Sequence, residues 1–343
     1  MKAIVAHGPK DLRIETRDMP EPGPGEVLVR MARGGICGSD LHYYNHGGFG
    51  TVRLREPMIL GHEVAGYVES VGQGVQTLAQ GDLVAVSPSR PCYTCAYCLD
   101  GAHNHCMDMR FYGSAMPFPH IQGAFREYVV ADVRQCAKAD GLDAGQAAMA
   151  EPLAVVLHAA RRAGDLMGKR VLITGCGPIG QLSVMVARAA GAVEIVATDV
   201  AGFTLSKAAE MGADTVHNVV EDPDALARYT GGKGRFDVLF ECSGVAAALA
   251  SAVSALRPGA IVMQLGLGGD MTLPLQVMTA KEIELRGSFR FHAEFFNAVE
   301  MMQSGRLDVS PLITQTLPMA KAVEAFELAS DRTCAIKAQI AFD

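Results

Sequence analysis

The sequence predicts an α/β protein in which a β-rich, barrel-like lobe is joined to a doubly wound parallel sheet covered by helices. Short β-type runs separated by Gly and Pro turns fill about the first 150 residues. After that point helical stretches alternate with continuous apolar strands, which is typical of a parallel sheet buried on both faces. The chain length of 343 residues accommodates two such domains, each with its own core.

The first lobe is predicted from three runs of β character, at residues 27–31, 64–71 and 83–86. Turn signals rich in Gly and Pro lie between them, at residues 22–25 and 72–74. We therefore expect residues 1–150 to form one β-rich domain.

The second domain is predicted from alternating helices and strands within residues 151–287. Helices are expected at 154–163, 179–190 and 203–211, and strands at 171–174, 194–198, 236–240 and 260–265. Beyond Gly287 this alternation loses its regular period, so residues 288–343 are predicted to return to the first lobe.

The composition excludes several classes of protein. The net charge of -7 argues against nucleic acid or an anionic membrane as the main partner. The chain has no run of 18 apolar residues, and its N-terminus lacks the apolar core of a signal peptide. A cytoplasmic protein is therefore expected, and nine cysteines in a reducing compartment suit metal binding better than disulfides.

Four of the cysteines share one short segment, residues 91–107, with the spacing C-x2-C-x2-C-x7-C. Four thiolates this close together are the ligand set of a tetrahedral structural zinc. The segment has little helical or strand periodicity, so a metal would hold it together. Two disulfides or four buried thiols are the alternative. The predicted zinc ligands are Cys92, Cys95, Cys98 and Cys106.

A glycine-rich turn, G-x-G-x-x-G, follows a predicted strand and opens a predicted helix. In that context the glycines permit a tight turn, the approach of a pyrophosphate and close packing of helix on strand. A carboxylate at the end of the next strand is placed to accept hydrogen bonds from the adenosine ribose, which favours NAD over NADP. The alternative is a glycine turn in an unrelated α/β fold. The residues assigned to the dinucleotide are Gly175, Gly177, Pro178, Ile179, Gly180 and Asp199.

A second metal constellation is scattered along the chain, at Cys37, His62 and Glu151. Each residue taken singly has a structural explanation, as a buried thiol, a strand-end histidine or a carboxylate at a helix N-terminus. Together they supply the sulfur, nitrogen and oxygen ligands of a catalytic zinc.

These motifs resemble the zinc-dependent medium-chain alcohol and polyol dehydrogenases over nearly the full chain. G-H-E at 61–63, C-G-S-D-x-H at 37–42, the four-cysteine segment, E-P-L at 151–153 and the glycine turn appear in the family's order. Longer strings at 33–44, 108–116, 118–120 and 287–291 resemble its polyol branch. The resemblance implies a GroES-like β-barrel catalytic domain and a Rossmann coenzyme domain.

The resemblance also implies the residues of the catalytic zinc. Cys37 and His62 take ligand positions, and the third ligand is either Glu63 or Glu151, with Glu151 slightly favoured. Glu151 stands where ethanol-type members carry a cysteine. With the structural site, the chain would hold two Zn²⁺ ions.

Proton transfer and substrate binding are implied in the same way. Ser39 and His42 match a relay that carries the substrate proton to solvent, although His42 could be a surface histidine. Tyr43 and Arg290 match substrate positions of polyol members. Arg110 is a further cation for a substrate carboxylate, or else a structural salt-bridge partner, and His120 is another candidate.

The implied activity is NAD-dependent oxidation of a sugar acid or polyol, in the first place of L-idonate to 5-keto-D-gluconate. Sorbitol, galactitol and butanediol are alternative substrates. A zinc-independent enone reductase and a non-catalytic NAD- and zinc-binding protein are alternatives of other classes. The sequence has no direct oligomer signal, and the resemblance implies a homotetramer or homodimer.

Overall fold

The structure, a computed structural model, describes residues Met1–Asp343 as two compact units. The first unit comprises Met1–Ala154, Phe291–Asp331 and Lys337–Asp343, and the second comprises Val155–Arg290 and Arg332–Ile336. The short segment 332–336 therefore joins the second unit, although no sequence pattern separates it from the residues around it.

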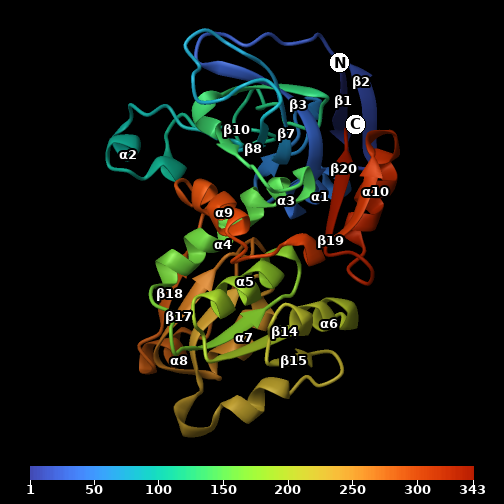
Figure 1. Cartoon of the computed structure of the whole chain (residues 1–343). Coiled ribbons are helices and arrows are strands. Elements are labelled where there is room, and N and C mark those ends of the chain that lie inside the picture. The colour runs from blue at the N-terminus through green and yellow to red at the C-terminus, as the bar shows by residue number, and fades with distance from the viewer. The chain divides into compact units, whose positions relative to one another are not determined.

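The first unit is built on one large sheet with the strand order β12-β8-β7-β3-β20-β19, in which β11 also pairs with β3. Figure 1 shows the C-terminal strand β20, in red, in the same lobe as the blue N-terminal strands. Because β20 pairs antiparallel with β3, the end of the chain becomes part of the first sheet. The strands are β3 (Glu26–Gly35), β7 (Glu63–Val71), β8 (Leu83–Val86), β11 (Tyr128–Asp132), β12 (Cys136–Lys138), β19 (Ile313–Pro318) and β20 (Lys337–Ala341).

Smaller sheets and short helices complete this unit. A three-stranded sheet has the order β2-β1-β6, from β2 (Asp11–Thr16), β1 (Lys2–Gly8) and β6 (Met58–Ile59), and two ribbons pair β9 (Ser89–Arg90) with β10 (Arg110–Phe111) and β4 (Gly48–Phe49) with β5 (Val52–Arg53). The helices are α1 (Gly38–His46), α2 (Ala96–Leu99), α3 (Ala144–Ala148), α9 (Glu294–Gln303) and α10 (Ala322–Ser330), with 3-10 turns η1 (His103–His105), η2 (Val133–Gln135), η5 (Ser310–Leu312) and η6 (Met319–Lys321).

One apolar core lies between the large sheet and its helices. It includes Met31 of β3, Val64 of β7, Phe326 of α10 and Ile340 of β20. The Phe326 ring contacts the rings of Tyr44 and Phe125 at centroid distances of 5.2 and 6.3 Å. Burial of these aromatic side chains attaches the C-terminal helix to the first lobe.

The second unit contains a parallel six-stranded sheet with the order β15-β14-β13-β16-β17-β18. Its strands are β13 (Arg170–Thr174), β14 (Glu194–Asp199), β15 (Thr215–Asn218), β16 (Phe236–Glu241), β17 (Leu256–Gln264) and β18 (Glu284–Gly287). The helices are α5 (Pro178–Ala189), α6 (Gly202–Glu210), α7 (Ala246–Val253) and α8 (Leu275–Ala280), with η3 (Ala225–Tyr229) and η4 (Gly231–Lys233). Helix α4 (Ala150–Ala163) begins in the first unit and continues into the second.

Both faces of this parallel sheet are covered. Val171 and Ile173 of β13 contribute to one apolar cluster, and Leu172, between them, contributes to the cluster on the other face. Successive side chains of a strand point to opposite faces, so a strand buried on both sides must be apolar throughout. The predicted α/β fold class is confirmed.

None of the helices combines the length and the apolar character that a membrane crossing requires.

Candidate metal and dinucleotide sites

The four-cysteine segment folds around α2 and η1, and its four sulfur atoms lie within 4.8 Å of one another. The Cys92 and Cys98 sulfurs are 4.0 Å apart, about twice the length of a disulfide bond. The backbone N–H groups of Cys92 and Cys95 donate to the sulfurs of Cys106 and Cys92, at 3.1 and 3.3 Å. Hydrogen bonds from Thr94 and from the backbone N–H of Cys95 lower the pKa of Cys92 to about 6. All nine cysteines are free thiols, so the disulfide alternative is not observed.

A second group brings together Cys37, His62 and Glu63, whose ligand atoms also lie within 4.8 Å of one another. Cys37 precedes α1, and Glu63 is the first residue of β7. Pairing of β3 with β7 places Gly35 opposite Glu63, which brings residues distant in sequence side by side. The group offers a thiol, an imidazole and a carboxylate, which is the donor set of a catalytic zinc with an open position.

Two glycines leave room for this group. A Cβ atom on Gly35 would stand 2.2 Å from Oε2 of Glu63. Gly61 has a φ of 89°, and a Cβ there would stand 2.0 Å from the ring of Phe125. Only glycine accommodates both the close approach at 35 and the left-handed backbone at 61.

Asp40 contacts the residues around the Cys37, His62 and Glu63 group. Its side chain is completely buried, and its two carboxylate oxygens accept the backbone N–H groups of Gly61 at 3.0 Å and Cys37 at 3.1 Å. One of these oxygens lies 3.8 Å from Nδ1 of His62, an atom that is buried and has no hydrogen-bond partner. Burial raises the pKa of Asp40, and the neighbouring His62 opposes that change. Asp40 thus stands where it can fix the ring of a metal-binding histidine.

Lys337, from the C-terminal strand β20, supplies a positive charge to the group. Its Nζ donates to both carboxylate oxygens of Glu63, at 2.8 and 2.6 Å, and to the carbonyl of Ile36 at 3.2 Å. Both side chains of the pair are at most 2% exposed. Burial alone would lower the pKa of Lys337, but the charges of Glu63 and Cys37 raise it.

Glu151 lies near these residues without belonging to the group whose ligand atoms are within 4.8 Å. It occupies the first turn of α4 and is buried. Burial raises its pKa to about 8; the neighbouring His62 works against this rise, and Glu63 adds to it. Burial likewise raises the pKa of the Cys37 thiol to about 12, and the charge of Glu63 contributes. A divalent cation among these side chains would favour their charged forms.

The predicted relay residues share helix α1. Ser39 is partly exposed and His42 is exposed, and a spacing of three residues places them on neighbouring turns of one face. The His42 ring contacts the rings of Phe49 and His46, with centroids 5.7 and 6.1 Å away.

The predicted substrate residues belong to different elements of the chain. Tyr43 is buried on α1, and its hydroxyl oxygen accepts the backbone N–H of Ala115 at 3.1 Å. Arg110 is exposed on the short strand β10. Arg290 ends a segment of the second unit with a φ of 55°, and its guanidinium lies 4.9 Å from the centroid of the Phe289 ring.

His120 is committed to structure. Its backbone N–H donates to Glu56 at 2.6 Å, Nε2 accepts the backbone N–H of Arg55 at 2.9 Å, and Nδ1 lies 2.9 Å from the carbonyl of Pro117. Because these contacts use both ring nitrogens, His120 holds its loop together and has no ring nitrogen left for a substrate.

In the second unit, the glycine turn joins β13 to α5. Gly175 has a φ of 86°, and a Cβ on Gly180 would stand 1.8 Å from the carbonyl oxygen of Gly175. Gly177 caps α5, with Pro178 as its first residue, and a Cβ at Gly177 would meet no atom within 4 Å. The helix N-terminus therefore faces open space, as the approach of a pyrophosphate requires.

Asp199 ends β14 beside this turn. Its carboxylate accepts backbone N–H groups from Cys176 at 2.5 Å, Val200 at 2.7 Å and Ala201 at 3.1 Å. The carboxylate therefore braces the glycine turn as well as standing at the predicted ribose position.

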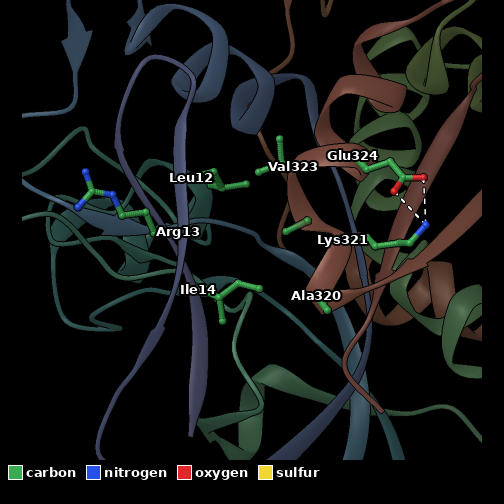
Figure 2. A pocket seen from close by; sticks show the side chains of 8 residues that line it. Leu12, Arg13, Ile14, Ala320, Lys321, Val323 and Glu324 are labelled. Atoms are coloured by element: carbon green, nitrogen blue, oxygen red, sulfur yellow. Dashed lines mark hydrogen bonds and ion pairs between the residues drawn. The ribbon is translucent and has the colours of Figure 1, made fainter.

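A hollow of about 580 Å³ lies elsewhere in the first unit, between β2 and the η6–α10 segment, and includes none of the predicted site residues. Figure 2 shows Leu12 and Ile14 on one side and Ala320 and Val323 on the other. Its charged side chains are engaged in ion pairs, Arg13 with Asp11 and Lys321 with Glu324. No metal-binding group and no predicted catalytic side chain lines this hollow, so it is not a candidate site.

Comparison with known proteins gives full-length matches. Residues 23–141 match the family described as "Alcohol dehydrogenase GroES-like domain", and residues 178–304 match "Zinc-binding dehydrogenase". L-idonate 5-dehydrogenase (NAD(P)(+)) of Escherichia coli is 44% identical over 99% of this chain and 98% of its own. Human sorbitol dehydrogenase is 39% identical over 95% of this chain and 91% of its own. A crystal structure of the E. coli L-idonate enzyme superposes with a TM-score of 0.93 at 42% identity, covering 99% of this chain and 98% of that one.

The chain belongs to the zinc-binding alcohol dehydrogenase family. The resemblance inferred from the motifs is confirmed, and so are the GroES-like and Rossmann assignments within the fold class. The protein is a zinc-dependent dehydrogenase of alcohols or polyols that uses a nicotinamide dinucleotide.

The dehydrogenase's side chains fit the groups that this family uses. The four-cysteine group matches a structural zinc in donor type and spacing. The partly buried Cys37 and the buried His62 and Glu63 match a catalytic metal. The buried, unpartnered Nδ1 of His62 faces Asp40, as a ligating histidine's second nitrogen commonly does. Open space at Gly177 fits a dinucleotide phosphate.

Sequence reasoning missed two residues of the dehydrogenase's metal group, Asp40 and Lys337. Asp40 stands inside the C-G-S-D-x-H motif, three residues after Cys37, and this position next to a predicted ligand could have indicated a supporting role. Lys337 is the first residue of the buried strand β20, and a lysine in a buried strand needs a buried partner. That partner, Glu63, lies 274 residues earlier, beyond the reach of local patterns.

The four-cysteine group gives a prediction on metal content. Cys98→Ser should lower the zinc content by about one ion per chain, because a tetrahedral structural site does not tolerate loss of a thiolate. Elemental analysis of the purified protein measures this directly. Cys334→Ser is the control, since Cys334 is exposed and belongs to neither group, and it should keep the wild-type zinc content. An unchanged zinc content in Cys98→Ser would contradict the assignment.

The Lys337–Glu63 pair gives a prediction on stability. Lys337→Met should reduce the free energy of unfolding by about 3–5 kcal/mol, because it leaves a buried carboxylate unpaired. Adding Glu63→Gln in the same chain should recover most of that loss. Urea unfolding followed by circular dichroism measures both.

Lys321→Met serves as the matched control for the buried pair. Lys321 and Glu324 form an exposed pair at 3.0 Å, so this variant should change the free energy of unfolding by less than about 1 kcal/mol. If the Lys337 and Lys321 variants lost equal stability, the special role of the buried pair would be refuted.

Proposed function

We propose that this dehydrogenase oxidises L-idonate at its fifth carbon to 5-keto-D-gluconate, reversibly, and transfers the hydride to NAD. The observation that carries the proposal is the 44% identity to an L-idonate 5-dehydrogenase along 99% of the chain. The group of thiol, imidazole and carboxylate agrees with this activity, because oxidation of a secondary alcohol requires the substrate oxygen to be polarised.

The chemistry is divided between the metal, the dinucleotide and the chain. A bound zinc supplies Lewis acidity toward the substrate oxygen and the nicotinamide accepts the hydride, which are roles that side chains do not replace. Cys37, His62 and Glu63 would hold that ion. A second zinc ion on the four cysteines would hold residues 91–107 together, which makes two zinc ions per chain.

Glu63 is our proposed third ligand, with Glu151 outside the immediate group. Glu63 shares the compact group with Cys37 and His62, whereas Glu151 does not. Lys337 donates to both oxygens of the Glu63 carboxylate and so orients it. Each oxygen keeps a further lone pair that could bind a metal ion. Glu151 forms no ion pair with Lys337, and burial raises its pKa, so a nearby positive charge would favour its ionised form.

The proton released by the substrate alcohol needs a path out of a buried site. Ser39 and His42 stand on one face of α1, with Ser39 partly exposed and His42 exposed. A hydroxyl can pass a proton on while receiving another, and an exposed imidazole exchanges protons with water near neutral pH. We therefore assign Ser39 and His42 to the relay.

Recognition of a sugar acid requires hydroxyl partners and a cation. Tyr43 is the proposed hydroxyl partner, and its oxygen accepts the backbone N–H of Ala115. Arg110 and Arg290 are the proposed cations, because a guanidinium can grip a carboxylate with two parallel hydrogen bonds. A neutral polyol would not use this contact.

The proposed cofactor is NAD rather than NADP. The Asp199 carboxylate would accept hydrogen bonds from the adenosine ribose hydroxyls and would repel a 2′-phosphate. Homo-oligomers, tetramers or dimers, are also proposed. In support, β18 is an edge strand of the second unit's sheet, and Leu275 and Leu285 nearby are 64% and 46% exposed.

A neutral polyol is the second candidate substrate, because human sorbitol dehydrogenase is 39% identical over 95% of this chain. Turnover of L-idonate, sorbitol, galactitol and 2,3-butanediol with NAD and NADP separates the candidates. We expect kcat/KM for L-idonate with NAD to exceed every other combination by about tenfold or more. Equal or faster turnover of sorbitol would overturn the L-idonate proposal in favour of the polyol.

A paired variant assay makes the substrate test sharper. Arg290→Ala should raise KM for L-idonate more than tenfold and leave KM for sorbitol within about twofold, because only the acid offers a carboxylate. Arg53→Ala, at an exposed arginine outside the proposed site, is the control and should change neither KM.

The third-ligand assignment predicts different metal contents for two variants. Glu63→Gln combined with Lys337→Met removes the proposed ligand together with its cation, and should reduce zinc from about two ions per chain to about one. Glu151→Gln should retain both ions and lose turnover. The reverse pattern in elemental analysis would assign the ligand to Glu151.

A further inference from the structure

Glu241 is a carboxylate buried in the middle of the second unit's sheet. It ends β16, is 0% exposed, and forms no ion pair with any lysine, arginine or histidine. A charge removed from water in this way is unfavourable unless hydrogen bonds replace its hydration. Its neighbours therefore have to supply those bonds.

Neutral donors surround the Glu241 carboxylate. One oxygen accepts the backbone N–H of Ser243 at 2.9 Å and the hydroxyls of Ser243 and Thr174, the latter at 3.4 Å. The other accepts Nε2 of Gln264 at 2.7 Å, and the backbone N–H of Gly244 lies 3.1–3.2 Å from both oxygens. Backbone and amide N–H groups can only donate, so the site is built for an ionised carboxylate.

The position of Glu241 in the sheet connects it with the dinucleotide. Glu241 pairs in register with Thr174 of β13 on one side and Gln264 of β17 on the other. The chain runs outward from β13 through β14 and β15, and outward in the opposite direction from β16 through β17 and β18. Ligands of such sheets bind outside the carboxyl ends of the strands at this reversal.

The loop held by Glu241 is packed tightly between two glycine-rich segments. A Cβ on Gly175, the first glycine of the dinucleotide turn, would stand 2.8 Å from the backbone of Ser243. On the other side, a Cβ on Gly268 would stand 1.6 Å from the carbonyl oxygen of Gly244, and one on Gly266 would stand 2.1 Å from its nitrogen. A displacement of residues 243–244 would therefore disturb both segments.

Charge adds a consequence beyond positioning. Asp199, the predicted ribose partner, ends β14 on one side of β13, so the nicotinamide half of the dinucleotide belongs to the side of β16 and β17. The oxidised nicotinamide ring carries a positive charge and the reduced ring does not. A fixed negative charge at the end of β16 interacts more favourably with the cationic ring, and a water-poor interior weakens this interaction less than water does.

We propose that Glu241 is a positioning residue of the nicotinamide half-site whose negative charge favours NAD⁺ over NADH. This rests on the proposed binding of the dinucleotide at Gly175–Gly180. The donors around Glu241 keep the carboxylate charged without a neutralising cation, so its field stays available to the ligand. The enzyme would thereby hold the oxidant for its alcohol substrate more firmly than an uncharged site would.

The test compares dissociation constants for NAD⁺ and NADH in the intact protein, by calorimetry and by NADH fluorescence. Glu241→Gln replaces an oxygen by an NH₂ group of similar size and removes the charge. We expect its Kd for NAD⁺ to rise about tenfold and its Kd for NADH to rise about threefold or less. An equal rise for both forms, or no rise, would overturn the proposal, because a purely structural role does not distinguish the two rings.

Gln264→Lys is a second route to the same outcome if Glu241→Gln does not fold. It keeps the carboxylate and places a cation against it, so the preference for NAD⁺ should fall by about threefold. Gln264→Met is its matched control, which removes the amide donor without adding charge and should keep the wild-type ratio. Thermal unfolding by circular dichroism verifies that each variant is folded.

The same measurements separate this inference from the proposed function. A wild-type protein that binds neither form of the dinucleotide would refute the function and the inference together. A wild-type protein that binds both, with an unchanged ratio in Glu241→Gln and Gln264→Lys, would refute only the role of Glu241.

Discussion

The buried ion pair between Lys337 and Glu63 is the interaction on which the first unit depends. Cys37, Glu63 and Glu151 place ionisable groups where solvent scarcely reaches, and such groups are unfavourable in a protein interior without an opposite charge. Lys337 supplies that charge from the last strand of the chain. The return of the C-terminal segment to β3 therefore completes the chemistry of the site as well as the sheet.

The two units solve the same problem of buried charge in different ways. Around the metal group, Glu63 is paired with the cation of Lys337. The Asp40 carboxylate accepts the backbone N–H groups of Cys37 and Gly61 and so fixes the backbone at these two residues. In the second unit, Asp199 and Glu241 are surrounded only by neutral donors. Carboxylates satisfied by dipoles keep their negative field, whereas a carboxylate paired with lysine loses most of it. A carboxylate paired with lysine suits a site that binds a single metal ion. Carboxylates held by neutral donors suit loops that bind a large ligand such as a dinucleotide.

The two metal groups also differ in how the chain forms them. The four cysteines belong to one short segment, and two backbone N–H groups turn toward the sulfurs. Cys37, His62, Glu63 and Lys337 come together only because β3 pairs with β7 on one side and β20 on the other. Loss of the four-cysteine group would remove what holds residues 91–107 together. A change in the Cys37, His62 and Glu63 group would affect the large sheet of the first unit.

The sequence alone determined the features that arise from neighbours along the chain. The apolar strands and the glycine turn at Gly175 each follow from a pattern within a few residues, and the structure has them within a few residues of the predicted bounds. The α/β class follows from the same patterns. The four-cysteine segment is equally local, which is why its sulfurs could be expected to converge.

Tertiary structure decided the matters that depend on strand pairing. Sequence reasoning left Glu63 and Glu151 open as alternatives, and the pairing of β3 with β7 brings Glu63 beside Cys37 and leaves Glu151 outside that group. It also revealed Asp40, Lys337 and Glu241, whose roles come from partners that local patterns do not show. Burial, register and the charge of distant neighbours are properties of the folded chain, because contacts between residues far apart in sequence exist only once the sheets have formed.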